Sequence, residues 1–150
     1  MIKRNIYLML VLTSVCSTSL QAEVLSGRGY ASVYIEAIAK SMLGKKYKWG
    51  GEGPYKYDCS GFTQKVFQRN GIHIPRLSKD QSKVGWKVKK SQLRKGDLIF
   101  FHSKHSQRVD HVGIYLGRGK FIHASRFHKR IVISPLREYR KLFKWGRRVT

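Results

Sequence analysis

The stretch YDCSGF places a cysteine, Cys59, between Asp58 and Ser60. A cysteine attacks a carbonyl carbon as its thiolate, and the start of a helix or a nearby cationic imidazole lowers the thiol pKa. Asp58 is of the residue type that caps helices, so Cys59 is expected to open a helix beside unpaired backbone N–H groups. Such groups can also receive a developing oxyanion. On its own, a lone cysteine is more often a buried structural residue, so the chemistry depends on its surroundings.

A nucleophilic cysteine needs a base, and the base needs a partner that orients it. His111 opens the segment HVGIYLG and His123 lies in KFIHAS, and the turn signal GRG between them predicts a β-hairpin. A two-residue loop would point the two rings to opposite faces. A three-residue loop, residues 117–119, makes His123 the diagonal neighbour of His111 on one face, and Gly119 suits its left-handed position. We therefore predict the three-residue loop, with His111 as base and His123 as its orienting partner.

A second pair of histidines, His102 and His105, has a spacing that resembles a pair of metal ligands. A zinc site needs at least three protein ligands, and no acid clearly joins this pair. The segment also has the composition of a polar loop. Metal catalysis is therefore the weaker alternative.

The first half of the chain predicts helices. Residues 30–43 carry apolar side chains at helical spacing, Val33 among them, and a glycine ends the pattern. A Gly-rich loop follows, and the helix that begins at Cys59 stops at an Asn-Gly pair. Ser78 is expected to cap a brief third helix.

The second half predicts strands in series. LIFF is a compact apolar run after the turn RKGD, the hairpin follows, and RIVISPL forms another strand. WKVKKSQL is ambiguous, and the tail REYRKLFKWGRRV is compatible with a strand or a helix. Helices followed by an antiparallel sheet predict an α+β domain rather than alternating βαβ units.

Residues 1–22 have the pattern of a secretory signal peptide: a positive end, an apolar run too short to span a bilayer comfortably, and Ala22 before the expected cut. The alternatives are a lipid anchor at Cys16 and an anchor that is never cut. The mature chain, residues 23–150, is then expected to be one exported domain, in the periplasm, in the cell envelope or secreted. It has a single thiol, so no disulfide can form within it.

The chain is strongly basic, with 31 Lys and Arg against 8 Asp and Glu and a formal net charge of +23 at pH 7. Such a surface attracts polyanions: nucleic acids, anionic lipid headgroups or acidic cell-wall polymers. Export argues against nucleic acid as the main partner. We therefore expect anionic envelope polymers or a lipid surface as partners, and a monomer.

Several motifs together resemble one family. YKWGGEGPYKYDCSGF, GIHIPR, LRKGDLIFF, DHVGIYLGRGKFIHAS and VISPL follow, in order and spacing, the NlpC-type cell-wall cysteine peptidases, over about residues 35–136. The resemblance implies a papain-like α+β fold, with N-terminal helices packed on an antiparallel sheet. It implies Cys59 as nucleophile, His111 as general base and His123 as the polar third member. It also implies that Tyr47 contributes to the oxyanion site and that no metal or cofactor is needed.

The same resemblance implies the reaction. This family cleaves stem peptides of peptidoglycan, typically between γ-D-glutamate and a diamino acid. Asp58 and Ser60 would lie near the amine end of the substrate, or only cap the helix, and Arg76 would bind a substrate carboxylate, or be an ordinary surface arginine. Two other functions stay open. One is a polyanion-binding envelope module of the same fold without catalysis, and the other is a transferase or another amidase that uses the same Cys-His-His set.

Overall fold

The structure is a computed structural model that describes residues 30–150. The predicted signal peptide, residues 1–22, and the alternative lipid anchor at Cys16 lie outside the described residues. Within residues 30–150, no helix combines the length and the apolar character needed to cross a bilayer.

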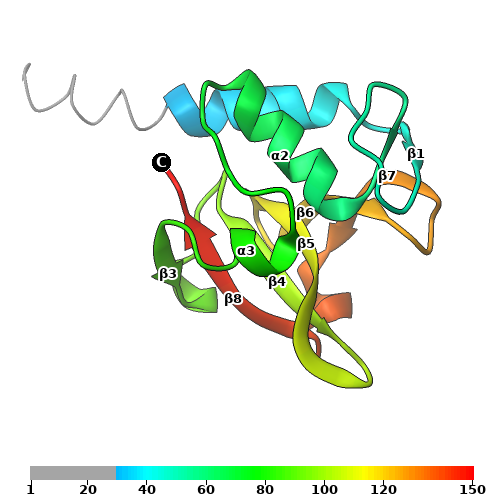
Figure 1. Cartoon of the computed structure of the whole chain (residues 1–150). Coiled ribbons are helices and arrows are strands. Elements are labelled where there is room, and N and C mark those ends of the chain that lie inside the picture. The colour runs from blue at the N-terminus through cyan, green and yellow to red at the C-terminus, as the bar shows by residue number, and fades with distance from the viewer. Residues whose placement is uncertain (1–29) are drawn as a thin grey trace, which may run out of the picture.

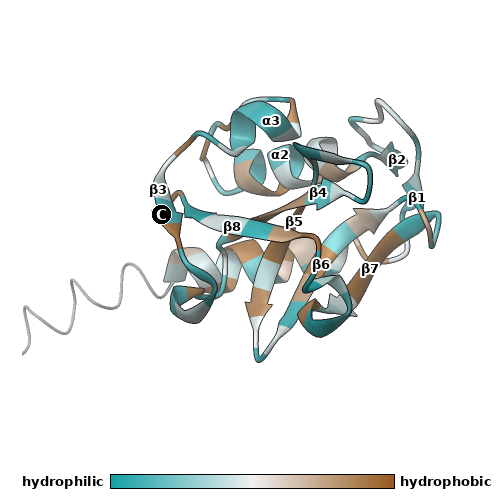
Figure 2. Ribbon diagram, turned by 90° about the horizontal axis from the view of Figure 1, so that it is seen from below, coloured by the Kyte–Doolittle hydropathy of each residue, from teal (hydrophilic) through white to brown (hydrophobic). Residues whose placement is uncertain are grey.

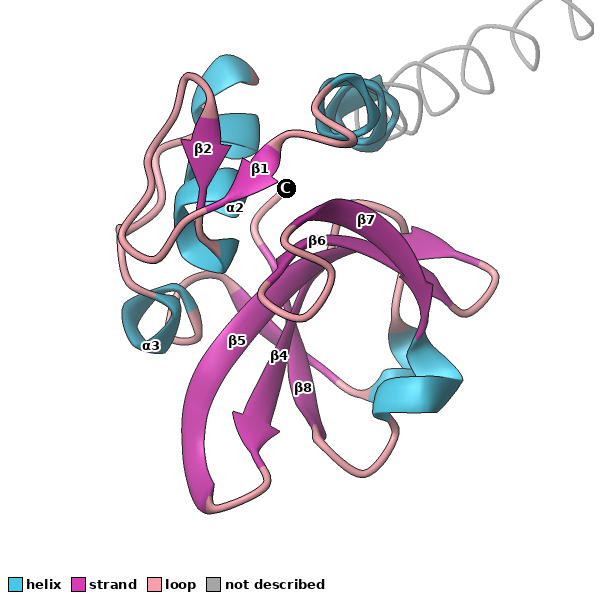
Figure 3. Cartoon of the chain, turned by 90° about the vertical axis from the view of Figure 1, so that its right-hand side faces the viewer, coloured by secondary structure: helices cyan, strands magenta, loops and turns pink. Residues whose placement is uncertain are grey.

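The helical segments pack on one face of the sheet (Figures 1 and 3). The first covers residues 30–41, as its apolar spacing predicts, although Val33 faces solvent with 58% of its surface exposed. α2 (Cys59–Arg69) begins where the sequence predicts, and Asn70 is its C-cap. α3 (Ser78–Gln81) is a single turn whose N-cap is Leu77, without a side-chain hydrogen bond, so the predicted Ser78 cap is wrong.

In the described part of the chain, eight strands form one curled sheet in the order β2-β1-β7-β6-β5-β4-β8-β3. Neighbouring strands are antiparallel except for β1 and β2, which are parallel. The strands are β1 (Lys46–Tyr47), β2 (Lys56–Tyr57), β3 (Trp86–Val88), β4 (Leu98–Ser103), β5 (Ser106–Gly117), β6 (Lys120–Ser125), β7 (Arg130–Pro135) and β8 (Phe143–Arg148). Two 3-10 helices, η1 (Lys90–Gln92) and η2 (Leu136–Tyr139), lie between strands. This is the α+β arrangement that the sequence predicts.

Apolar side chains pack against both faces of the sheet, and Figure 2 shows the hydrophobic stretches along its strands. On the helix-covered face, Phe62 of α2 packs in the same core as Ile122 of β6. On the opposite face, Phe101 packs with Phe121. Because side chains alternate along a strand, His123 shares the face of Phe121.

The β5–β6 hairpin differs from the predicted loop but has the predicted register. The loop has two residues, Arg118 and Gly119, rather than three. A β-bulge next to Gly117 then shifts the pairing by one residue. Beyond the bulge Tyr115 pairs with Phe121, which is the register expected from the longer loop. The predicted loop length is therefore wrong, but the bulge restores the register that puts both catalytic candidates on one face.

Three further segments also contain regular secondary structure. The predicted loop before Cys59 contains the two short strands β1 and β2. The ambiguous segment WKVKKSQL forms β3 and then η1, and the tail forms η2 and then β8, so each contains a strand and a helical turn. β5 begins at Ser106, earlier than the predicted apolar segment, because the polar residues before His111 extend the pairing with β4.

Candidate active site

Cys59 occupies the first position of α2, as predicted. Asp58 is the N-cap, with an extended backbone (φ −90°, ψ −180°) and a carboxylate that accepts a 2.7 Å hydrogen bond from the backbone N–H of Gly61. Gly61 has no space for a side chain, because a Cβ there would lie 2.2 Å from the carbonyl oxygen of Gly51. The Gly-rich loop therefore closes tightly over the start of the helix and leaves 9% of the Cys59 surface exposed.

The electrostatics of the thiol are dominated by burial. Burial raises the pKa of Cys59 to about 11, and the Asp58 carboxylate acts in the same direction. Hydrogen bonds from the backbone N–H groups of Val112, Ser60 and Cys59 itself lower this pKa. The start of the helix therefore acts on the sulfur in the predicted direction, but burial outweighs it, and the resting thiol is protonated at neutral pH.

The two predicted histidines meet on the sheet. Nε2 of His111 in β5 lies 2.8 Å from Nδ1 of His123 in β6, with the ring planes at 82°. Nε2 of His123 lies 3.1 Å from Oγ of Ser134 in β7. Three adjacent strands therefore carry one hydrogen-bonded row of side chains: His111, His123 and Ser134.

Aromatic packing fixes this row. The ring of His123 lies 4.6 Å from that of Phe121 and 5.5 Å from that of Tyr139, and the ring of His111 lies 5.8 Å from that of Phe101. Burial lowers the pKa of His111 to about 4, and it lowers the pKa of His123 well below its usual value, with neighbouring imidazoles adding to the effect. Both rings are therefore neutral at neutral pH, so each has one N–H donor and one acceptor nitrogen.

The Cys59 thiol lies against the backbone of β5, the strand that carries His111. The sulfur of Cys59 accepts a hydrogen bond from the N–H of Val112, the residue that follows His111, and α2 packs against β5. Because Nε2 of His111 faces His123, Nδ1 is the ring nitrogen of His111 that has no hydrogen-bond partner among the described residues. The structure therefore places Cys59 against the strand that carries His111, and it brings His111 and His123 into contact with each other.

Tyr47 lies beside the loop that carries the nucleophile. It belongs to β1 and pairs in parallel with Tyr57, two residues before Cys59. Burial raises the pKa of the Tyr47 phenol, and the ionised forms of Cys59 and Asp58 would raise it further, so the hydroxyl keeps its proton at neutral pH. A neutral hydroxyl in this place can donate a hydrogen bond to an oxyanion.

Arg76 joins the residues that flank the nucleophile. Its Nε donates to Glu52 (2.9 Å), Nη1 to Asp58 (3.0 Å) and Ser60 (2.9 Å), and Nη2 to Asp58 (2.7 Å) and the carbonyl oxygen of Gly51 (3.4 Å). These hydrogen bonds, that to Asp58 above all, raise the pKa of Arg76. Since its five N–H groups all meet protein acceptors, the predicted substrate contact would require Arg76 to give up a partner. In this arrangement Arg76 ties the Gly-rich loop to the helix cap.

Two residues at the site could not be identified from any sequence motif. The hydroxyl of Ser134 is hydrogen-bonded to Nε2 of His123, the ring nitrogen that faces away from His111. Gln81 is fully buried and donates from Nε2 to the carbonyl oxygens of Ser60 (3.0 Å) and Pro75 (2.8 Å). Both roles depend on contacts between segments that are distant in the sequence, so only the spatial structure reveals them.

The alternative metal pair does not join the site. His102 lies in β4 with Nδ1 2.7 Å from the carbonyl oxygen of Ser103, and His105 is exposed in the following turn. Across the described residues, no three His, Cys, Asp or Glu side chains are grouped so that they could hold a metal ion.

Known proteins share this sequence pattern and geometry. The model of the NlpC/P60 family matches residues 44–147. The gamma-D-glutamyl-L-lysine dipeptidyl-peptidase of Bacillus cereus is 45% identical over 98 residues, which are 65% of this chain and 29% of that protein. The crystal structure of an NlpC/P60 family protein from Bacillus cereus superimposes with a TM-score of 0.75 at 38% identity, over 79% of this chain and 40% of that one.

One isolated domain is matched over nearly its whole length. The NlpC/p60 domain of peptidoglycan hydrolase SagA superimposes with a TM-score of 0.70 at 32% identity, over 78% of this chain and 97% of that domain. The chain thus spans less than a third of the dipeptidyl-peptidase but nearly all of this domain. The predicted papain-like α+β fold is confirmed, and the chain belongs to the NlpC/P60 family.

Proposed function

We propose that this protein is a cysteine peptidase that hydrolyses an amide bond in the stem peptides of peptidoglycan. Cys59 is the nucleophile, His111 the general base and His123 the residue that orients the base. The observation that carries the proposal is the hydrogen-bonded row from His111 to Ser134, together with the position of Cys59 at the start of α2 against Val112, the residue that follows His111.

The row specifies the protonation of each ring. A base that accepts a proton on Nδ1 must carry its own hydrogen on Nε2, so His111 donates to Nδ1 of His123. His123 then carries its hydrogen on Nε2 and donates to Oγ of Ser134. Each ring nitrogen along the row therefore has one defined role, and the row supports the imidazolium that forms at His111.

The proton moves as the bond forms. A helix start and a nearby cationic imidazole both favour a thiolate, but burial favours the neutral forms of both Cys59 and His111. His111 therefore takes the thiol proton while the sulfur attacks the amide carbonyl carbon. The negative charge passes from the sulfur to the carbonyl oxygen, which the backbone N–H of Cys59 and the Tyr47 hydroxyl stabilise.

The same histidine completes both halves of the reaction. His111 returns its proton to the leaving amine, the carbon–nitrogen bond breaks, and a thioester to Cys59 remains. His111 then removes a proton from water, which attacks the thioester. Collapse of that second intermediate releases the carboxylic acid, and the thiol regains its proton.

We propose that the bond joins γ-D-glutamate to a diamino acid. The support is the name of the Bacillus cereus relative, a gamma-D-glutamyl-L-lysine dipeptidyl-peptidase. Asp58 and Ser60 then lie near the amine end of the substrate. Arg76 acts by positioning, because its contacts hold these two residues in place.

We propose that residues 1–22 direct export to the periplasm, the envelope or the medium, where the substrate is found. The support is the pattern of a positive end, an apolar run and a small residue. Mass spectrometry of the secreted chain tests this directly, because the signal peptide predicts an N-terminus at Glu23. A lipid-modified Cys16 at the N-terminus would instead show that the protein is lipid-anchored.

The reaction itself is tested by digesting purified muropeptides with the wild-type protein and with its Cys59→Ala variant, followed by mass spectrometry. The proposal predicts new fragments that end in γ-D-glutamate and fragments that begin with the diamino acid, only with the wild type. The same fragments from the Cys59→Ala variant would overturn the cysteine mechanism. Fragments cut at another amide would overturn the assigned bond, and products coupled to an amine would indicate a transferase.

A further inference from the structure

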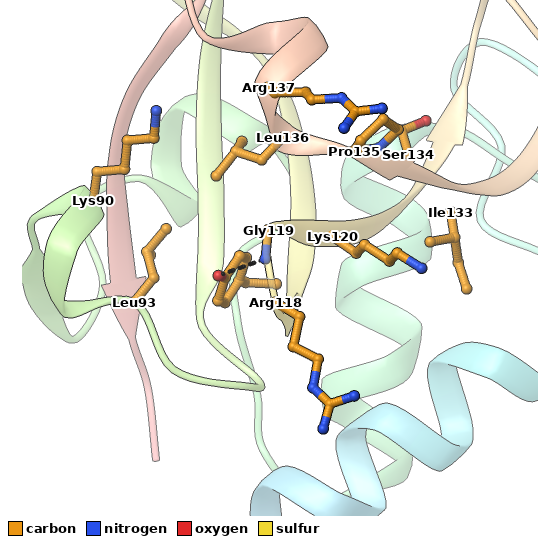
Figure 4. Close-up of a pocket in the computed structure, with 11 residues that line it drawn as sticks. Lys90, Leu93, Arg118, Gly119, Lys120, Ile133, Ser134, Pro135, Leu136 and Arg137 are labelled. Atoms are coloured by element: carbon orange, nitrogen blue, oxygen red, sulfur yellow. Dashed lines mark hydrogen bonds between the residues drawn. The ribbon is translucent and has the colours of Figure 1, made fainter.

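A second concave site lies at the turn of the β5–β6 hairpin (Figure 4). The cavity has a volume of about 550 Å³. We call it the turn groove, and it is formed by Lys90, Leu93, Arg118, Lys120, Leu136 and Arg137. Gly117 is six residues along β5 from His111, so at about 3.3 Å per residue the turn is about 20 Å from the catalytic base. The lining also includes Ser134, which contacts His123, so one side of the turn groove adjoins the histidine row, whereas Arg118 at the turn lies away from His111.

The rim of the turn groove is cationic and has no internal counterions. Lys90, Arg118, Lys120 and Arg137 are exposed, and the lining includes no Asp or Glu. Within residues 30–150, none of these four side chains makes a hydrogen bond or an ion pair with the protein. Other cations on this protein do find carboxylates, such as Arg148 with Asp97 at 2.8 Å. The turn groove therefore has a local excess of positive charge that no carboxylate of the described residues neutralises.

The interior of the turn groove is apolar and rigid. Leu93, Leu136 and Ile133 contribute aliphatic surface, and Ile133 is 39% exposed. Tyr115 also lines it, and its hydroxyl accepts a 3.0 Å hydrogen bond from the backbone N–H of Gly119, which Figure 4 shows as a dashed line. An apolar floor under a cationic rim fits a polymer whose negative charges alternate with short carbon units.

Phosphodiester groups suit this rim better than other anions. Two of the four cations are arginines, Arg118 and Arg137, whose planar N–H groups match two oxygens of one phosphate. Nucleic acid fits less well, because strand binders usually present aromatic faces for base stacking. The aromatic residue of this groove, Tyr115, is half-buried and fixed through its hydroxyl.

We infer that the turn groove binds a polyol-phosphate chain of the cell envelope and so holds the enzyme close to its substrate. The choice of an envelope polymer rests on the proposed function, whereas binding of the polymer does not depend on catalysis. An experiment can therefore contradict polymer binding without contradicting the proposed peptidase activity, and the reverse.

Binding is measured with the full chain carrying Cys59→Ala, by fluorescence anisotropy of labelled poly(glycerol phosphate). The groove variant is Lys120→Gln with Arg137→Gln. The matched control is Lys79→Gln with Arg108→Gln, which removes one exposed lysine and one exposed arginine elsewhere. All four residues are on the surface, and melting temperatures establish that each variant is folded.

We expect the groove variant to lose about tenfold in affinity and the control less than about twofold, because only the groove concentrates the contacts on one phosphate chain. In a Cys59 background, the groove variant should cleave a short soluble stem peptide at the wild-type rate. Equal losses in the two variants would overturn the site and leave only diffuse charge. Groove-dependent binding that is as tight for polygalacturonate or single-stranded DNA would overturn the polyol-phosphate assignment.

Discussion

The polar side chains at one end of the β5–β6 hairpin are hydrogen-bonded to one another, whereas those at the other end are not. At one end, His111 and His123 are held in a row in which the ring nitrogens that face each other and Ser134 are all paired. At the other end, Arg118 and its neighbours surround a groove without a protein partner. Buried polar groups must be paired to be stable, and exposed cations need not be. The same two strands thus carry a paired row of side chains at the candidate active site and an unpaired cationic rim at the turn groove.

Arg76 and Arg137 differ in the same way, in whether their N–H groups are hydrogen-bonded to the protein. Arg76 gives all its N–H groups to acceptors around the helix cap, whereas Arg137 gives none to the described residues. Arg76 therefore acts as part of the scaffold, and Arg137 is available to a ligand. This difference could not be predicted from the sequence, which does not show which acceptors lie near each arginine in the folded chain.

The strongest test of the paired end is His111→Gln. Without a base the thiol keeps its proton, so kcat/KM for a soluble stem peptide should fall by about a thousandfold. His102→Gln is the control, because that ring lies outside the site, and it should stay within about twofold of the wild type. A His111→Gln protein that keeps more than a tenth of wild-type activity would contradict the assignment of the base.

The pH dependence of alkylation tests the protonation of the thiol. With a pKa raised to about 11, the thiolate fraction of Cys59 is small below that pH and increases about tenfold per pH unit. The rate of iodoacetamide alkylation should therefore rise about a hundredfold from pH 7 to pH 9. A plateau across this range would indicate a preformed thiolate–imidazolium pair instead.

Substitution of Arg76 tests its positioning role. Arg76→Gln leaves the largely buried carboxylate of Asp58 without its two strongest side-chain contacts, so the free energy of unfolding should fall by about 1–3 kcal/mol. Urea titration measures this change, and Arg108→Gln is the matched surface control, expected within about 0.5 kcal/mol. If Arg76→Gln instead keeps wild-type stability and only raises KM, the arginine contacts the substrate directly.

The smallest expected effect belongs to Ser134. Ser134→Ala removes one neutral hydrogen bond from the row, so kcat should fall by about fivefold while KM stays constant. Ser134→Thr keeps the hydroxyl and should recover most of the rate. A rise in KM with unchanged kcat would show that Ser134 acts on substrate binding rather than through His123.

The sequence predicts well the fold and the elements that carry the catalytic candidates, because both depend on local patterns. The Asp58 cap, the helix that starts at Cys59 and the strands that carry the histidines follow from residue types and short spacings. The hairpin shows the limit of this reasoning, since the loop length is wrong and the register is right only because a bulge adds a residue. A bulge depends on packing against neighbouring strands, which one segment does not encode.

What the sequence could not predict depends on contacts between distant segments. Gln81 and Ser134 have no motif, yet each completes hydrogen bonds at the site. The protonation of Cys59 also escaped prediction, because the helix start is visible in the sequence and the extent of burial is not. Local sequence thus indicates which groups are candidates for the reaction, and the tertiary structure sets their protonation.

The most direct test of the account uses a nitrophenyl ester of the γ-carboxyl of an alanyl-D-glutamyl dipeptide. An activated ester acylates quickly, so the thioester should accumulate before water releases it. We predict a burst of one equivalent of nitrophenol per enzyme and, after acid quenching, an acyl group on the peptide that contains Cys59. Steady turnover without a burst and without an acylated peptide, or an acyl group on another residue, would contradict the claim that Cys59 is the nucleophile.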